Sequence, residues 1–187
     1  MVSGPSGAGK GTVISLARRA LPNVVTSVSA TTRAPRPGEL DGLHYRFLST
    51  ADFRRAVAEG NFLEWVDYGG NLYGTLRADV EDKLAQGYDV ILEIELQGAR
   101  VIRRSMPTAT LIFVAPPSVD ELARRLHGRA TDTPKAIARR LEIAKAELAA
   151  EHEFDEVIVN DEPERAAAEV VAIMARRRTR ETRHKGD

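Results

Sequence analysis

The stretch Gly4-Pro5-Ser6-Gly7-Ala8-Gly9-Lys10 decides the fold of this chain. Glycines leave backbone N–H groups free to converge on phosphate oxygens, and Lys10 then reaches the outer phosphates as a point charge. Apolar residues from Val13 to Leu21 recur at helical spacing directly after the lysine. A helix there presents its positive N-terminal end to the same phosphates. The stretch therefore predicts a nucleotide phosphate loop that leads into a helix.

Two features of this loop depart from the strict motif. Gly11 stands where the motif has Ser or Thr, so we expect the hydroxyl role to be displaced, with Thr12 as the candidate. Only Met1-Val2-Ser3 precede the loop. The strand that feeds the loop is therefore very short, or the natural start lies upstream.

The rest of the chain alternates between strand and helix patterns. We expect strands at 24–29, 88–95, 110–115 and 157–159. We expect helices at 52–59, at 76–86, around Val101, at 119–128, at 134–150 and from Pro163 onward. Gly87 is the expected C-cap of the helix at 76–86. This alternation predicts an α/β fold with a parallel sheet and helices on both faces.

An antiparallel ribbon interrupts this order. Residues 62–68 alternate in polarity, and Gly69-Gly70-Asn71 makes a turn into Leu72-Tyr73. The preceding segment 31–42 is rich in Pro, Gly and Arg, which is typical of a loop. We interpret the ribbon as part of an inserted lobe.

Composition excludes several classes of protein. The chain has no cysteine, which excludes a disulfide framework, a cysteine zinc site and a thiol nucleophile. Lys+Arg and Asp+Glu both number 27, so no global charge favours nucleic acid or membrane as a partner. No apolar run has the length of a membrane span. We expect a soluble cytoplasmic protein, with the basic segment 176–185 as a solvated helix end rather than a nucleic-acid contact.

Several sequence blocks together resemble the guanylate kinase family along nearly the whole chain. The blocks are Ser3–Gly7, Val28–Glu39, Phe62-Leu63-Glu64-Trp65, Tyr73-Gly74-Thr75, Leu92–Gly98, Ala115-Pro116-Pro117-Ser118 and Ile158-Val159-Asn160-Asp161. The resemblance implies ATP + GMP ⇌ ADP + GDP on a single domain of three parts. These parts are a parallel core (about 1–32, 81–124 and 141–187), a GMP-binding lobe (about 33–80) and a helical lid (about 125–140).

The monophosphate site is centred on two arginines. Arg33 and Arg36 lie in a loop stiffened by prolines, so their guanidinium groups are partly preorganised for bidentate phosphate contact. The resemblance adds Tyr45 and Tyr73 as phenolic donors at the same phosphate.

Base selection is expected from a carboxylate. Guanine presents two adjacent donors, and an ionised carboxylate is an acceptor with two oxygens that match this edge. The resemblance places Glu64 in this role, and it adds Ser29, Thr75 and Glu95 to the base site. Adenine would leave these buried groups unpaired.

The lid is inferred from its arginines. Arg125, Arg129, Arg139 and Arg140 flank Asp132-Thr133-Pro134, which we interpret as a hinge and a helix start. Arginines that fold over the transferring phosphoryl group neutralise its charge and exclude water. We assign Arg125 and Arg129 to ATP, and Arg140 to both catalysis and GMP. The resemblance implies that Asn160 contacts adenine.

The expected mechanism needs no general base, because the attacking phosphate oxygen is already largely ionised near neutral pH. The four histidines, His44, His127, His152 and His184, lie in no recognisable catalytic or metal-ligand spacing. Catalysis then depends on in-line positioning and on charge neutralisation by Lys10, Arg33, Arg129, Arg140 and Mg²⁺. We expect no direct protein–metal bond, with Glu93 as a candidate ligand of Mg²⁺ through water.

Two other functions remain open. A ribose-bisphosphate kinase on the same scaffold would have no reason to keep Ser29, Glu64, Thr75 and Glu95 together. A guanylate-kinase-like binding module usually loses the phosphate-loop lysine, whereas Lys10 is present here. The predicted partners are therefore GMP and ATP, with neither nucleic acid nor membrane.

Overall fold

The computed structural model describes residues 1–127 and 134–184, with side chains described over 1–127 and 137–178. Contacts between Cα atoms divide the chain into two compact units. The first comprises Asn23–Ala109 together with Met1, and the second comprises Val2–Pro22 and the chain from Thr110 onward. Arg129, Asp132 and Thr133, assigned above to the lid and its hinge, lie outside the described residues.

The second unit contains a parallel sheet in the order β1-β8-β9. Its strands are β1 (Val2–Ser3), β8 (Ile112–Ala115) and β9 (Glu156–Val159). β8 is buried along its whole length because it lies between the other two strands. β1 has only two residues, which pair with Ile112 and Phe113. The strand before the phosphate loop is therefore very short in this structure.

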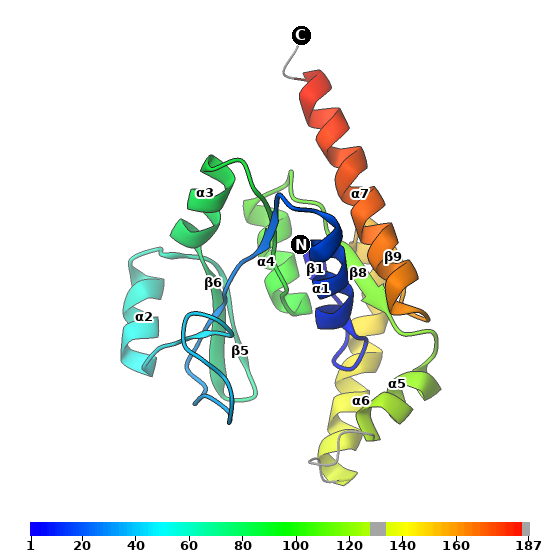
Figure 1. The fold of residues 1–187 in the computed structure, drawn as a ribbon. Helices are drawn as coiled ribbons and strands as arrows, with labels where there is room; N and C mark the ends of the chain where they lie inside the picture. Colours follow the sequence, from blue (N-terminus) through cyan, green and yellow to red (C-terminus); the bar gives the residue numbers. More distant parts are fainter. Residues whose placement is uncertain (128–133, 185–187) are drawn as a thin grey trace. The chain divides into compact units, whose positions relative to one another are not determined.

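Helices complete the second unit. α1 (Lys10–Ala20) and α7 (Pro163–His184) pack side by side, as Figure 1 shows, and α7 begins at Pro163 as predicted. α5 (Val119–His127) packs on α6 (Pro134–Ala149) through a cluster that includes Leu122 and Leu126. A short 3₁₀ turn, η1 (Glu151–Glu153), follows α6.

The first unit contains a second pair of parallel strands, β2 (Val24–Thr26) and β7 (Asp89–Ile91). Both are shorter than predicted. Leu92 and Ile94, which follow β7, are nevertheless buried in a core cluster with Ile102 from α4 (Leu96–Ser105). The apolar residues after β7 are therefore explained by burial in the core and not by a longer strand.

The predicted ribbon is part of a larger sheet with the order β4-β3-β6-β5. The hairpin of β5 (Phe62–Tyr68) and β6 (Asn71–Leu76) is confirmed, and its two strands are antiparallel. The sheet also contains two strands that were not predicted, β3 (Ala30–Thr31), which ends at the first residue of the expected loop 31–42, and β4 (Arg46–Phe47), which follows that loop. Two residues are too few to give a periodic pattern, and both strands form only because a long-range partner is available.

Two helices flank the β5–β6 hairpin in sequence, α2 (Thr50–Ala58) and α3 (Arg77–Ala85). Gly87 follows α3 with φ of 85°. Its N–H donates to Leu84, and the next N–H, that of Tyr88, donates to Lys83. This is the glycine C-cap that the sequence predicted.

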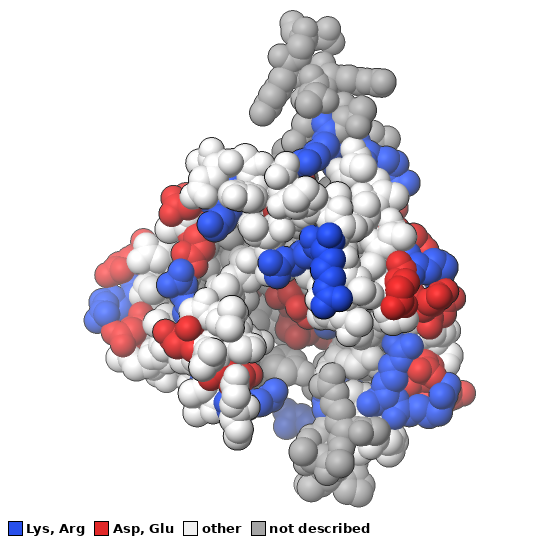
Figure 2. Space-filling model, viewed as in Figure 1, with Lys and Arg blue, Asp and Glu red and all other residues white. Residues whose placement is uncertain are grey.

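The fold class is therefore α/β, with parallel strands, helices and an antiparallel insertion. On the face shown in Figure 2, acidic and basic side chains are interspersed. No described helix is long and apolar enough to cross a membrane.

Candidate active site

The phosphate loop occupies the turn between β1 and α1, and three of its glycines have positive φ. These angles are 143° at Gly4, 93° at Gly7 and 88° at Gly9. A Cβ on Gly4 would lie 2.2 Å from the carbonyl oxygen of Val114, and one on Gly9 would lie 2.4 Å from Nδ2 of Asn160. Only glycine satisfies both the backbone angle and the space at these positions.

Lys10 is buried to 9% exposure at the first position of α1. Its ammonium donates to the carbonyl oxygens of Gly4 at 2.5 Å and Pro5 at 3.3 Å. The charge is therefore held over the loop, beside the backbone that the motif uses for phosphate. Gly11 and Thr12 are exposed in the first turn of the helix.

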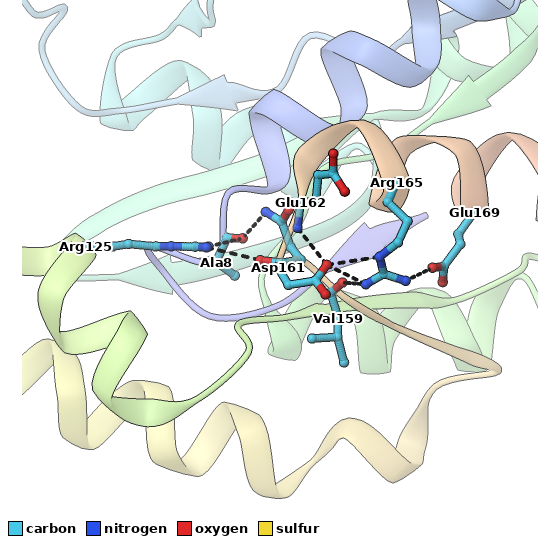
Figure 3. Close-up of polar contacts among 8 residues, drawn as sticks. Ala8, Arg125, Val159, Asp161, Glu162, Arg165 and Glu169 are labelled. Atoms are coloured by element: carbon cyan, nitrogen blue, oxygen red, sulfur yellow. Dashed lines mark hydrogen bonds and ion pairs between the residues drawn. The ribbon is translucent and has the colours of Figure 1, made fainter.

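Two side chains from later in the chain hold the phosphate loop at the carbonyl oxygen of Ala8. This oxygen accepts hydrogen bonds from Nδ2 of Asn160 at 2.7 Å and from Nη1 of Arg125 at 3.4 Å. Arg125 also donates to the backbone oxygen of Asn160 and to Glu121, and Figure 3 shows its side chain directed at Ala8. Arg125 and Asn160, two of the residues assigned to ATP from the sequence, thus contact the loop itself.

An ion-pair network fixes the segment that carries Asn160. Oδ1 of Asp161 accepts from Arg165 and from the backbone N–H of Glu162, while Arg165 also donates to the backbone of Val159 and pairs with Glu169 (Figure 3). The hydrogen bond from Arg165 lowers the pKa of Asp161, which keeps this carboxylate ionised. Asn160 is 2% exposed, and its Oδ1 has no hydrogen-bond partner among the described residues.

The lid arginines have different positions. Nη2 of Arg140, on α6, donates to Oγ of Ser6 at 2.6 Å, so this arginine already reaches the phosphate loop. Arg139 is exposed on the same helix.

The contact geometry at Gly4 gives a stability prediction. Gly4→Ala should lower the free energy of unfolding by about 3 kcal/mol or more, because the new methyl group meets rigid backbone in a core strand. Gly60→Ala is the matched control, since Gly60 has φ of 72° and open space around it. It should cost only about 1 kcal/mol of backbone strain. Urea denaturation of both variants measures the difference, and equal losses would contradict the argument.

In the first unit, one carboxylate organises the loop 31–42, which carries Arg33 and Arg36. Glu39 accepts from Nη2 of Arg33 at 2.9 Å and, through its other oxygen, from the backbone N–H of Arg36 at 2.7 Å. The hydrogen bond from Arg33 lowers the pKa of Glu39 and in turn raises the pKa of Arg33. The loop is therefore preorganised by an ion pair as well as by its prolines.

Two tyrosines lie beside this loop. The guanidinium of Arg33 lies 5.4 Å from the ring centroid of Tyr45, and the ring of Tyr73 meets Tyr45 edge-on at 6.1 Å. Burial raises the pKa of the Tyr45 phenol, as do the nearby Tyr73 and Glu93, so it stays a hydrogen-bond donor at neutral pH. The first unit thus brings Arg33, Tyr45 and Tyr73 together, while Arg36 is exposed.

Glu64 is a buried carboxylate with 4% exposure. It faces Thr75 across the hairpin, and its Oε1 accepts from the threonine hydroxyl at 2.7 Å. Burial raises the pKa of Glu64, and the hydrogen bonds from Thr75 oppose that shift. A carboxylate with one oxygen bonded and little solvent is set up to receive further donors.

The remaining predicted residues lie in the same unit. Ser29 is half-buried, and its carbonyl oxygen accepts from the N–H of Arg46 in β4. Glu95 is the N-cap residue of α4, and Glu93 before it is exposed.

Sequence reasoning missed the residues that support the site. Glu121 lies four residues before Arg125, and Asp161 four before Arg165. On α5 this spacing is the signal that pairs opposite charges on a helix. Asp161 lies two residues before α7 and has the same spacing to Arg165 in the first turn of that helix. Glu39 has no such signal, because a loop gives no period from which its partner can be inferred.

Comparisons with known proteins identify the family of this chain. The guanylate kinase family model matches residues 1–177. The guanylate kinase of Rubrobacter xylanophilus is 57% identical over 176 residues, covering 94% of this chain and 92% of the relative. That of Streptomyces coelicolor is 54% identical over 173 residues, covering 92% and 88%. A crystal structure of guanylate kinase from Anaplasma phagocytophilum matches with a TM-score of 0.75 at 33% identity, covering 93% of this chain and 82% of that one. With a phosphate loop in one unit and the buried Glu64–Thr75 pair in the other, this chain belongs to the guanylate kinase family.

Proposed function

We propose that this protein transfers the γ-phosphoryl group of ATP to GMP, giving ADP and GDP. The observation that carries the proposal is the buried Glu64–Thr75 pair, in a chain that also keeps Lys10 on an intact phosphate loop. The loop accounts for a triphosphate donor, and the pair accounts for a guanine acceptor.

The donor site is assigned to the second unit. Backbone N–H groups of Gly4 to Gly9 bind the phosphates, with Pro5, Ser6 and Ala8 shaping the loop and Gly11 and Thr12 beginning the helix. On binding, Lys10 exchanges the carbonyl oxygens of Gly4 and Pro5 for phosphate oxygens. Arg125 and Asn160 support the loop and border the adenine.

Most of the acceptor residues belong to the first unit, and Arg140 of the second unit is proposed for GMP as well as for catalysis. Arg33, Arg36, Tyr45 and Tyr73 hold the phosphate of GMP. Glu64 accepts from the two donors of the guanine edge, with Ser29, Thr75 and Glu95 around the base. Two donor hydrogens on its carboxylate stabilise the ionised form and so offset the cost of burial that raises its pKa.

The proposed transfer step depends on the charges of the attacking phosphate and of the transferring phosphoryl group. The GMP phosphate is already largely a dianion at neutral pH, so its oxygen attacks the γ-phosphorus in line without a general base. Positive groups must then stabilise the charge on the transferring phosphoryl group. We assign this task to Lys10, Arg33, Arg129 and Arg140.

Mg²⁺ is proposed to enter with ATP. Among the described residues no group of three His, Cys, Asp or Glu side chains is placed to hold a metal ion. Mg²⁺ is usually bound mainly by nucleotide phosphates and water. Glu93 is exposed and is proposed to contact it through water. When bound, the ion supplies further neutralisation of phosphate charge.

We propose further that 33–80 and 125–140 act as a GMP-binding lobe and a lid on the core. Closure of such segments excludes water from the reaction.

A direct assay tests the activity. The protein is supplied with ATP and Mg²⁺ and with GMP, AMP or ribose bisphosphate as acceptor, and ADP is measured. We expect kcat/KM for GMP to exceed that for AMP by about 10²-fold or more, because adenine leaves Glu64 unpaired. Equal rates on AMP would contradict guanine recognition. Transfer to ribose bisphosphate would favour the other kinase, and no ADP with any acceptor would favour a binding module.

A further inference from the structure

Gly98, the third residue of α4, has no conformational reason to be glycine. It lies within the helix, and its φ is not among the positive values in the described backbone. Glycine is also among the least favourable residues in a helix interior. The reason must therefore lie in its surroundings.

The side chain that lies nearest to Gly98 is the carboxylate of Glu64. A Cβ at Gly98 would lie 2.5 Å from Oε2 of Glu64 and 3.1 Å from its Cδ. The next neighbour, Cβ of Ile94, is at an ordinary contact distance of 3.5 Å. Alanine at this position would therefore clash with one group only, the carboxylate.

The carboxylate has little freedom to move away. Thr75 bonds its other oxygen, and the side chain is 4% exposed. β5, which carries Glu64, packs against α4. Thr75 thus holds one oxygen while the bare backbone of Gly98 leaves room for the other. The position beside the first turn of α4 also favours a negative charge.

We infer that Gly98 is a positioning residue for guanine recognition: its missing side chain leaves the space in which the Glu64 carboxylate takes the orientation that receives the base. The inference rests on the proposed function, in which Glu64 accepts from guanine. Gly98 itself does not need to touch the nucleotide.

A double-mutant cycle of Gly98→Ala and Glu64→Ala tests the inference, with Gln97→Ala as the control on the exposed neighbour in the same helix. Gly98→Ala should raise KM for GMP by about tenfold, with kcat and KM for ATP changed by less than about twofold. In the Glu64→Ala background it should leave KM for GMP unchanged. Gln97→Ala should leave both constants near their original values.

Thermal denaturation supplies a readout that does not depend on GMP. Gly98→Ala should lower Tm in the original protein, because the methyl group displaces a confined carboxylate. In the Glu64→Ala background the sign should reverse, with Tm raised by about 2–4 °C, because alanine is the better helix former.

The outcomes separate the two claims. An equal effect of Gly98→Ala in both backgrounds, on Tm or on KM, would overturn the inference while leaving the role of Glu64 intact. If Glu64→Ala alone left KM for GMP unchanged, the proposed base recognition would fail, and the inference with it. A loss of kcat with unchanged KM in Gly98→Ala would also overturn it.

Discussion

Lys10→Ala should reduce kcat/KM for phosphoryl transfer on the order of 10³-fold, the largest effect that we expect from a single side chain. Lys10 is the only lysine in the phosphate loop, and its ammonium already lies within 3.3 Å of two loop carbonyl oxygens. In a buried position a point charge on the outer phosphates is poorly screened by water, so its removal leaves the transition-state charge uncompensated. Loss of the charge should affect kcat at least as strongly as KM.

The Lys10 variant is checked by ADP production and by calorimetric titration of GMP. GMP binding should stay close to that of the original protein, because Lys10 is assigned to ATP and not to GMP. Lys145→Ala is the control, since Lys145 is an exposed lysine of the same unit that pairs with Glu142. A Lys10 variant that keeps a tenth or more of the activity would refute the assignment of the loop.

Glu64→Gln should reduce kcat/KM for GMP by about 10²-fold. The substitution keeps the shape of the side chain but replaces one acceptor oxygen with an amide donor, which opposes a donor of guanine. The site is 4% exposed, so water cannot repair the mismatch. KM for ATP should stay within about twofold, because ATP is assigned to the other unit.

Asp67→Asn is the matched control for Glu64→Gln. Asp67 is an exposed acid on the same strand, and its oxygen accepts from the N–H of Gly70 in the hairpin turn, a role that asparagine can keep. The control removes one negative charge from β5 without touching the buried pair. If both variants lost GMP affinity equally, the effect would reflect net charge, and a collapse of ATP binding in Glu64→Gln would make Glu64 structural.

Local features of the fold were predictable from the sequence. The turn at Gly69-Gly70 defined the hairpin, Gly87 ended α3, and Pro163 began α7, and each is found in the structure. These signals depend on backbone angles and on hydrogen bonds within a few residues, so they do not need the rest of the chain. The short strands β3 and β4 had no such signal, because their pairing partners lie far away in sequence.

The phosphate loop shows the same difference between features set by local sequence and features set by long-range contacts. Its glycines and Lys10 were sufficient by themselves to predict a phosphate site next to a helix, because the chemistry of that site resides in seven consecutive residues. Only the tertiary structure decided that Asn160 and Arg125 hold the loop at Ala8, and that Gly98 leaves space for the carboxylate of Glu64. Those contacts join residues more than 30 positions apart. Their geometry depends on packing between elements, which a local pattern of residues does not encode.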